Sequence, residues 1–189
     1  MEKRWGDARE GIEILKSGGL VVYPTDTLYG LGCSCAECMK RLFKIKGREK
    51  NFSLIFPDAA SAIDFLVSEG GDPNPEVICE FLPGPFTFII SGWGIRVPQC
   101  EIALTLARGA GPITATSANF QGKKGPTTAQ ESFSELGGLV DLYIDGGTTR
   151  YGGPSTVVEL QEGKVSILRN GVGDTWKSRN GRTIGELAR

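Results

Sequence analysis

The sequence contains no histidine among its 189 residues. This absence excludes the Ser-His-Asp and Cys-His catalytic groups and the HExxH zinc site, because each of them requires an imidazole. The chain also lacks a run of about 18 consecutive apolar residues, so we expect no transmembrane helix. Residues 1–11 lack the apolar segment of a signal peptide. We therefore expect a cytoplasmic protein in which any catalysis depends on binding, orientation and fixed charge.

Neither sign of charge dominates the composition. Lysine and arginine number 21 and aspartate and glutamate number 22, which gives a formal net charge of −1. A nearly neutral chain is not expected to bind polyanions nonspecifically, so any such binding requires a local cluster of positive charge.

Cysteine is present but odd in number, with five residues. Without a secretory signal we expect reduced thiols rather than a disulfide framework. Cys33, Cys35 and Cys38 form a C-x-C-x2-C pattern, which raises the alternative of a zinc site. A structural zinc site needs a fourth ligand that no histidine can supply, so we interpret these cysteines as small core residues.

The order of predicted elements favours an α/β fold. Hydrophobic residues make up 40% of the chain, enough for one sizeable core. Helices and strands alternate without a strict βαβ rhythm, which predicts a mixed sheet flanked by helices. We expect one domain over residues 1–175 and a polar, basic, poorly ordered tail over 176–189. Helices are predicted near 5–15, 36–46, 58–66, 76–82, 102–108 and 128–136, and strands near 20–23, 53–56, 86–90, 113–115, 139–144, 155–160 and 165–168.

Polar residues follow the first apolar strand directly. Thr25, Asp26 and Thr27 come after it, where ligand sites of α/β proteins often form. The alternative is that Thr25 and Asp26 cap a helix that begins near Leu28.

A basic run over residues 40–50 ends in Lys46-Gly47-Arg48. Such a run is ordinarily the solvated face of a helix. The second interpretation is a polyphosphate-binding site, because the lysine offers a point charge and the arginine a bidentate guanidinium on either side of one glycine.

Short polar side chains recur later in the chain. Residues 114–119 (TATSAN) follow a predicted strand and precede a glycine-rich loop over 121–128. Such a loop can bind phosphate through its backbone N–H groups, although an ordinary turn also fits the pattern. Arg96, Ser155 and Arg169 lie at strand ends and are weak signals when taken separately.

Taken in order, these segments resemble the YrdC-like family. The matching blocks are YPTDTLYGLGC (23–33), FKIKGR (43–48), PGPFTFII (83–90), GIRVP (94–98), TATSAN (114–119) with GPTTA (125–129), STVVEL (155–160) and ILRNG (167–171). The resemblance implies a single-domain fold, a twisted mixed sheet flanked by helices with a concave cationic groove. It also implies synthesis of threonylcarbamoyl-AMP and pyrophosphate from L-threonine, bicarbonate and ATP with Mg²⁺, for the N6-threonylcarbamoyladenosine at position 37 of tRNA.

The resemblance also implies roles for individual residues. The residues expected to contact threonine are Thr27, Arg96, Ala115 and Ser155. The residues expected to hold the nucleotide are Lys46, Arg48, Ser117, Asn119, Gly125 and Arg169, with Lys46 and Arg48 as the catalytic cations. The implied partners are the substrates and tRNA or the tRNA-modification machinery, and the implied assembly is a monomer or homodimer.

Two alternatives follow from departures from the family pattern. Residues 51–54 and 171–174 resemble the YciO branch, which suggests a protein that binds tRNA or double-stranded RNA through its basic segments. Phe52 and Pro57 replace a polar residue and a histidine of the synthases, which keeps open a carbamoyl-adenylating transferase of the hydrogenase-maturation type.

Overall fold

The computed structural model describes residues 5–47 and 52–188. Its strands are β1 (Trp5–Gly6), β2 (Val21–Tyr23), β3 (Gly30–Gly32), β4 (Ser53–Ile55), β5 (Phe86–Ile90), β6 (Trp93–Arg96), β7 (Ile113–Ser117), β8 (Leu142–Ile144), β9 (Thr156–Gln161) and β10 (Lys164–Arg169). Its helices are α1 (Ala8–Lys16), α2 (Ala36–Lys46), α3 (Ala59–Ser68), α4 (Pro75–Phe81), α5 (Glu101–Ala110), α6 (Ala129–Leu136), the 3-10 helix η1 (Gly137–Leu139) and α7 (Ile184–Leu187). None of the helices in these two segments is long and apolar enough to cross a membrane.

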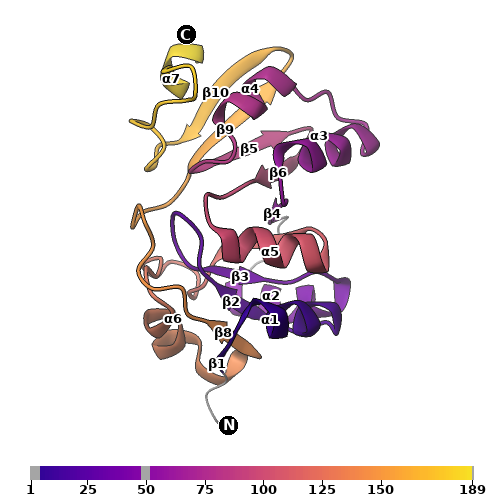
Figure 1. Cartoon of the computed structure of the whole chain (residues 1–189), viewed down its shortest axis with the longest axis vertical. Coiled ribbons are helices and arrows are strands. Elements are labelled where there is room, and N and C mark those ends of the chain that lie inside the picture. The colour runs from indigo at the N-terminus through magenta and orange to yellow at the C-terminus, as the bar shows by residue number, and fades with distance from the viewer. Residues whose placement is uncertain (1–4, 48–51, 189) are drawn as a thin grey trace.

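All of these strands join one sheet in the order β1-β8-β2-β3-β7-β4-β6-β5-β9-β10. Figure 1 shows β1 at one end of the molecule and β9 and β10 at the other. Parallel pairs such as β2/β8, β4/β6 and β5/β9 occur together with antiparallel pairs such as β2/β3, β4/β7 and β9/β10. The prediction of a mixed sheet flanked by helices is therefore confirmed.

Polar caps determine where several helices begin. Asp58 accepts a hydrogen bond from the Ser61 amide at 2.7 Å, as expected for the N-cap of α3. Thr128 caps α6 by accepting from the Glu131 amide at 3.2 Å. The first helix begins later than predicted, because Asp7 caps α1 and leaves Trp5 in strand β1.

Strand β2 divides its side chains between two cores. Val21 and Tyr23 pack with residues of α1 and α5, whereas Val22 packs on the opposite face with residues of α2 and α6. This alternation is the period-two pattern of a strand that is buried on both faces. A third core covers the far half of the sheet and includes residues of α3, α4, β5 and β9.

Strand β3 is built largely of glycine, and the prediction missed it. Gly30 and Gly32 pair with Tyr23 and Val21 of β2. A Cβ atom at Gly30 would lie 2.8 Å from Tyr23 Cζ, and one at Gly32 would lie 2.7 Å from Tyr23 Cε1. Only glycine leaves room for the Tyr23 ring across these two positions.

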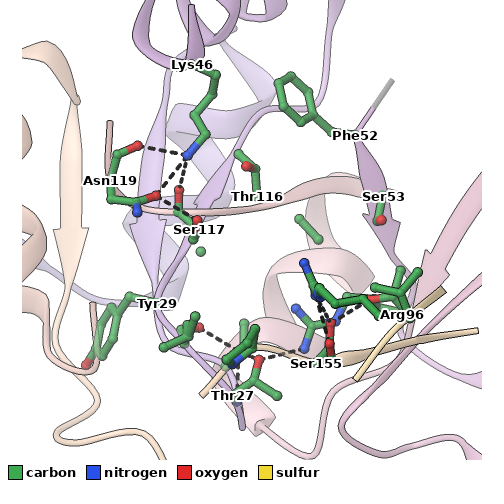
Figure 2. A pocket seen from close by; sticks show the side chains of 18 of the residues that line it. Thr27, Tyr29, Lys46, Phe52, Ser53, Arg96, Thr116, Ser117, Asn119 and Ser155 are labelled. Atoms are coloured by element: carbon green, nitrogen blue, oxygen red, sulfur yellow. Dashed lines mark hydrogen bonds between the residues drawn. The ribbon is translucent and has the colours of Figure 1, made fainter. Parts of the chain in front are cut away.

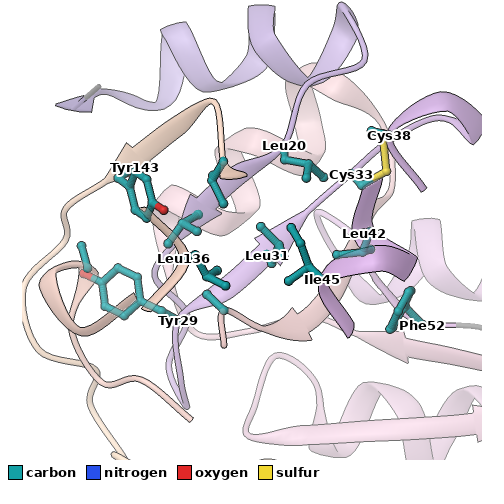
Figure 3. Packing of buried hydrophobic residues seen from close by; sticks show 14 residues of the cluster. Leu20, Tyr29, Leu31, Cys33, Cys38, Leu42, Ile45, Phe52, Leu136 and Tyr143 are labelled. Carbon is teal, nitrogen blue, oxygen red and sulfur yellow. A yellow bond between two sulfur atoms is a disulfide. The ribbon is translucent and has the colours of Figure 1, made fainter. Parts of the chain in front are cut away.

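The structure corrects the expectation that the cysteines are reduced. A disulfide joins Cys33 to Cys38 in the core beneath α2 (Figure 3), whereas Cys35, Cys79 and Cys100 are free. Cys33 and Cys38 are both buried, so their interpretation as core residues agrees with the structure. The described residues contain no cluster of histidine, cysteine or carboxylate side chains that could hold a metal ion.

The segment after residue 175 packs against the sheet and differs from the poorly ordered tail that we expected. The Trp176 ring contacts Phe81 and Phe86 at centroid distances of 6.1 and 5.5 Å. Arg182 binds the buried carboxylate of Glu80 through its Nε atom at 2.9 Å. The Trp176 ring, this ion pair and the fully buried Ile184 hold a segment that is polar overall.

This packing predicts that Ile184→Ala destabilises the whole domain. Ile184 in α7 is fully buried within the third core. Its truncation should lower the free energy of unfolding by about 2–5 kcal/mol, through lost burial and a new cavity. Urea unfolding measures the change, with Leu168→Ala on the exposed surface of β10 as a control expected to stay within about 0.5 kcal/mol. Equal stability of the two variants would show that the segment is loosely attached.

Candidate active site

A cavity of about 510 Å³ lies where the two halves of the sheet meet. Its walls come from the turn after β2, the end of α2, strands β4, β5, β6 and β7, and the start of β9 (Figure 2). Segments that are distant in sequence therefore supply one site. Its lining includes most of the residues singled out in the sequence.

The turn after β2 is stabilised by hydrogen bonds of a hydroxyl group within the turn. Thr25 Oγ1 accepts from the Thr27 amide at 3.1 Å and donates to the Leu28 carbonyl at 2.6 Å. The chain then enters β3, so the alternative of a helix that begins near Leu28 is wrong. The turn brings the Thr25 and Thr27 side chains to the cavity.

Arg96 at the end of β6 reaches this turn. Its Nη2 donates to Thr27 Oγ1 at 2.8 Å and lies 3.4 Å from Asp26 Oδ1. The other Asp26 oxygen accepts from the Gln99 amide at 3.0 Å. Burial raises the pKa of Asp26, and the Arg96 guanidinium opposes that increase. Within the part of the chain that the structure describes, the buried Arg96 Nε has no hydrogen-bond partner, and the guanidinium lines the cavity.

Asp26→Asn should destabilise the fold through this pair. The side chain of Asp26 is completely buried and that of Arg96 is 10% exposed, so water cannot replace the carboxylate. Breaking a buried ion pair from one side costs about 3 kcal/mol, and urea unfolding should show a loss of that size. Asp64→Asn on the exposed face of α3 is the matched control. An Asp26 variant as stable as this control would show that the pair is unimportant.

A second arginine enters the cavity from β10. A register shift in the β9/β10 pairing falls between Ile167 and Arg169. Arg169 Nη2 donates to the Ser155 carbonyl at 2.8 Å and to Ser155 Oγ at 3.2 Å. Ser155 Oγ also lies 2.8 Å from Thr87 Oγ1. Burial, and then repulsion from Arg96, lower the pKa of Arg169, which is the expected effect of two cations in one cavity.

Lys46 occupies the opposite side of the cavity. This last residue of α2 is 2% exposed, and Gly47 ends the helix in the left-handed conformation. Lys46 Nζ donates to the carbonyl oxygens of Ser117 and Asn119 at 2.9 and 2.8 Å and to Asn119 Oδ1 at 2.9 Å (Figure 2). Lys44 on the same helix is exposed, so the interpretation as a solvated helix face fits Lys44 but not the buried Lys46.

Of the other residues predicted for the site, some line the cavity and others do not. Ala115 lines the cavity with Ser117 and Asn119. Gly125 is not among its lining residues and lies behind Leu28, where an added Cβ would be 2.4 Å from Leu28 Cδ1. Arg48 lies outside the described residues.

The described lining includes side chains that were given no place in the predicted site. Lys123 lines the cavity, and its carbonyl accepts from Asn119 Nδ2 at 2.7 Å. Thr87 lies in the strand-like FTFII block, where nothing marked its hydroxyl as functional. Phe52 also lines the cavity and packs 5.9 Å from Phe43.

Charge in the cavity is one-sided. Its described lining carries four cationic side chains, those of Lys46, Arg96, Lys123 and Arg169, and includes no aspartate or glutamate. Such a lining attracts an anionic ligand with several charged groups. Hydroxyls between the two arginines add positions that can orient a small polar molecule. These features suit polyanionic and carboxylate ligands.

Comparison with known proteins identifies the family. Residues 13–171 match the family model Sua5/YciO/YrdC, described as telomere recombination, and the chain belongs to this family. The threonylcarbamoyl-AMP synthase of Pyrococcus abyssi is 35% identical over 175 residues, which cover 83% of this chain and 52% of that protein. The synthase of Bos taurus is 32% identical over 88% of this chain and 69% of its own length. The chain thus spans about half the length of the Pyrococcus relative.

Solved structures agree with this assignment. The crystal structure of Pyrococcus abyssi Sua5 complexed with L-threonine matches with a TM-score of 0.74 and 33% identity, covering 87% of this chain and 54% of that one. The crystal structure of Escherichia coli YciO matches with a TM-score of 0.72 and 28% identity, covering 92% and 95%. The predicted fold is confirmed, and both branches named in the sequence analysis share it.

Proposed function

We propose that this protein is an L-threonylcarbamoyladenylate synthase, which forms threonylcarbamoyl-AMP and pyrophosphate from L-threonine, bicarbonate and ATP. The observation that carries the proposal is the buried Arg96, with an unpartnered Nε, inside a cavity that has cations on both sides. The names of the relatives and the threonine complex of Sua5 support the choice of reaction.

The arginine side of the cavity suits the amino acid. Arg96 would pair with the threonine carboxylate, since a guanidinium binds a carboxylate through two parallel hydrogen bonds. The hydroxyls of Thr27 and Ser155 lie on this side and can orient the polar groups of threonine, and Ala115 would supply an apolar contact. This arrangement leaves the amine to react.

The lysine side suits the nucleotide phosphates. Lys46, Ser117 and Asn119 form one connected group, and Ser117 Oγ donates to Asn119 Oδ1 at 2.6 Å. Arg169 would contact the phosphates from the opposite wall. We assign Arg48 to the same side from the sequence resemblance, and Gly125 would act only indirectly, through Leu28.

The reaction needs no imidazole. The threonine amine loses a proton and adds to carbon dioxide derived from bicarbonate, which gives a carbamate. A carbamate oxygen then attacks the α-phosphorus of ATP, the bond to the β-phosphate oxygen breaks, and pyrophosphate leaves. The chain contributes by holding both reactants together and by stabilising the negative charge with fixed cations.

Magnesium would enter with ATP as part of the substrate. The described lining offers hydroxyl and carbonyl oxygens but no carboxylate, so it fits a metal held mainly by phosphate oxygens. The product would then supply the threonylcarbamoyl group for adenosine 37 of tRNA, through tRNA or the modification machinery as partners.

Pyrophosphate release tests the proposal. The protein is incubated with ATP, Mg²⁺ and bicarbonate, with and without L-threonine, and we expect release only when threonine is present. Substituting carbamoyl phosphate for threonine and bicarbonate tests the carbamoyl-adenylating alternative in the same assay. Pyrophosphate release that does not change when threonine is omitted would refute the proposed function.

A further inference from the structure

A tight turn directly after β10 packs against the wall of the cavity. The Val172 amide donates to the Pro154 carbonyl at 3.0 Å, and Thr156 Oγ1 donates to Asp174 Oδ1 at 2.6 Å. The same Asp174 oxygen accepts from the Gly171 amide at 3.1 Å, which closes the turn. The match to the family ends at residue 171, so Asp174 lies beyond the segment that the family model describes.

Ser155 lies between the two residues that this turn holds. Its carbonyl accepts from Arg169, and its hydroxyl lies 2.8 Å from Thr87 Oγ1. An added Cβ at Gly171 would lie 2.6 Å from both the carbonyl carbon and the carbonyl oxygen of Ser155. The turn therefore touches the Ser155 backbone and leaves no space for it to move in that direction.

The hydrogen bond between Thr156 and Asp174 is the strongest restraint on the contact between the turn and the Ser155 backbone. Thr156 is fully buried, so no water can replace the partner of its hydroxyl. Hydrogen bonds to a carboxylate are roughly twice as strong as neutral ones. Neither Asp174 nor Thr156 is among the described residues that line the cavity, so any effect on a ligand passes through neighbouring lining residues such as Ser155.

We propose that Asp174 is a positioning residue, which fixes the Ser155 hydroxyl for the amino-acid substrate through its bond to Thr156. This inference rests on the proposed function for its effect on catalysis. Small displacements of an orienting group reduce productive binding. The segment beyond the family match thereby tunes selectivity for threonine, with a smaller effect on the nucleotide side through the Arg169 bond to Ser155.

The experiment compares four variants in the pyrophosphate assay. Asp174→Ala and Thr156→Val should each raise the KM for threonine by about tenfold, and the double variant should match Asp174→Ala, which already removes the bond that Thr156→Val removes. Asp174→Asn keeps an acceptor oxygen and should restore most of the threonine affinity. The KM for ATP should change less than about twofold throughout. Asp72→Ala, at an exposed position between α3 and α4, is the matched control.

Hydrogen exchange provides a readout that is independent of turnover. The amides of Thr156 and Val172 donate to Pro85 and Pro154, and both should exchange faster in Asp174→Ala than in the control. Unchanged exchange would overturn the inference whatever the activity. Three kinetic results in an active protein would also overturn the inference. These are an unchanged KM for threonine, additive effects in the double variant, and equal increases in the KM values for threonine and ATP. Pyrophosphate release by the wild-type protein at the same rate with and without threonine would instead refute the proposed function.

Discussion

Lys46→Met is expected to reduce threonine-dependent pyrophosphate release by about 10²–10³-fold, because a preorganised positive charge that stabilises the transition state is lost. Lys46 is buried at the end of α2 and lies against Ser117 and Asn119. Methionine keeps the apolar length of the side chain and removes only its charged end. Steady-state kinetics at saturating threonine measures the loss in kcat.

The control for this prediction is on the same helix. Lys44→Met makes the same chemical change at an exposed position, and we expect turnover within about twofold of wild type. Unfolding must be measured in parallel, because three acceptor oxygens lose a donor and destabilisation of about 1–3 kcal/mol is expected. If folded Lys46→Met and Lys44→Met turn over equally, the assignment of Lys46 to catalysis is wrong.

Arg96→Gln is expected to lower kcat/KM for threonine by at least about 30-fold, since truncating one partner of a buried charge pair costs about 2–5 kcal/mol. The Arg96 guanidinium lines the cavity and would bind the carboxylate. Thermal shifts should show the same selectivity, with stabilisation by threonine lost and stabilisation by ATP largely retained. Arg108→Gln removes an exposed arginine on α5 and serves as control. Loss of both ligand responses together would indicate general damage rather than a carboxylate site.

Local signals predicted most helices and several strands because caps and periodicity act over few residues. Asp58 and Thr128 each cap a helix within three residues, so neighbouring sequence determines those boundaries. Strand β3 was missed because a Gly-Leu-Gly segment has no intrinsic preference for a strand. It becomes a strand because β2 and β7 flank it and the Tyr23 ring covers its glycines.

The site was predictable where residues carry charge or hydroxyls in family blocks. Lys46, Arg96 and Ser155 were singled out before any geometry was known, and all three line the cavity. The contribution of Thr87 was not predictable, because a lone hydroxyl in an apolar strand gives no signal until its neighbour across the sheet is known. The Asp174 contact to Thr156 likewise depends on how the turn after β10 packs against β9, whereas the disulfide joins cysteines only five residues apart and was missed because a reduced state was expected for all of them.

The position of β7 in the sheet has a consequence for folding. This mid-chain strand pairs with β3 on one side and β4 on the other, and β2 pairs with β8 from much later in the chain. Sheets that depend on such remote pairings form slowly, since long loops must close before the pairings can stabilise them. A ribosome-bound chain would therefore lack a complete cavity until β10, which supplies Arg169 to its wall, has left the exit tunnel.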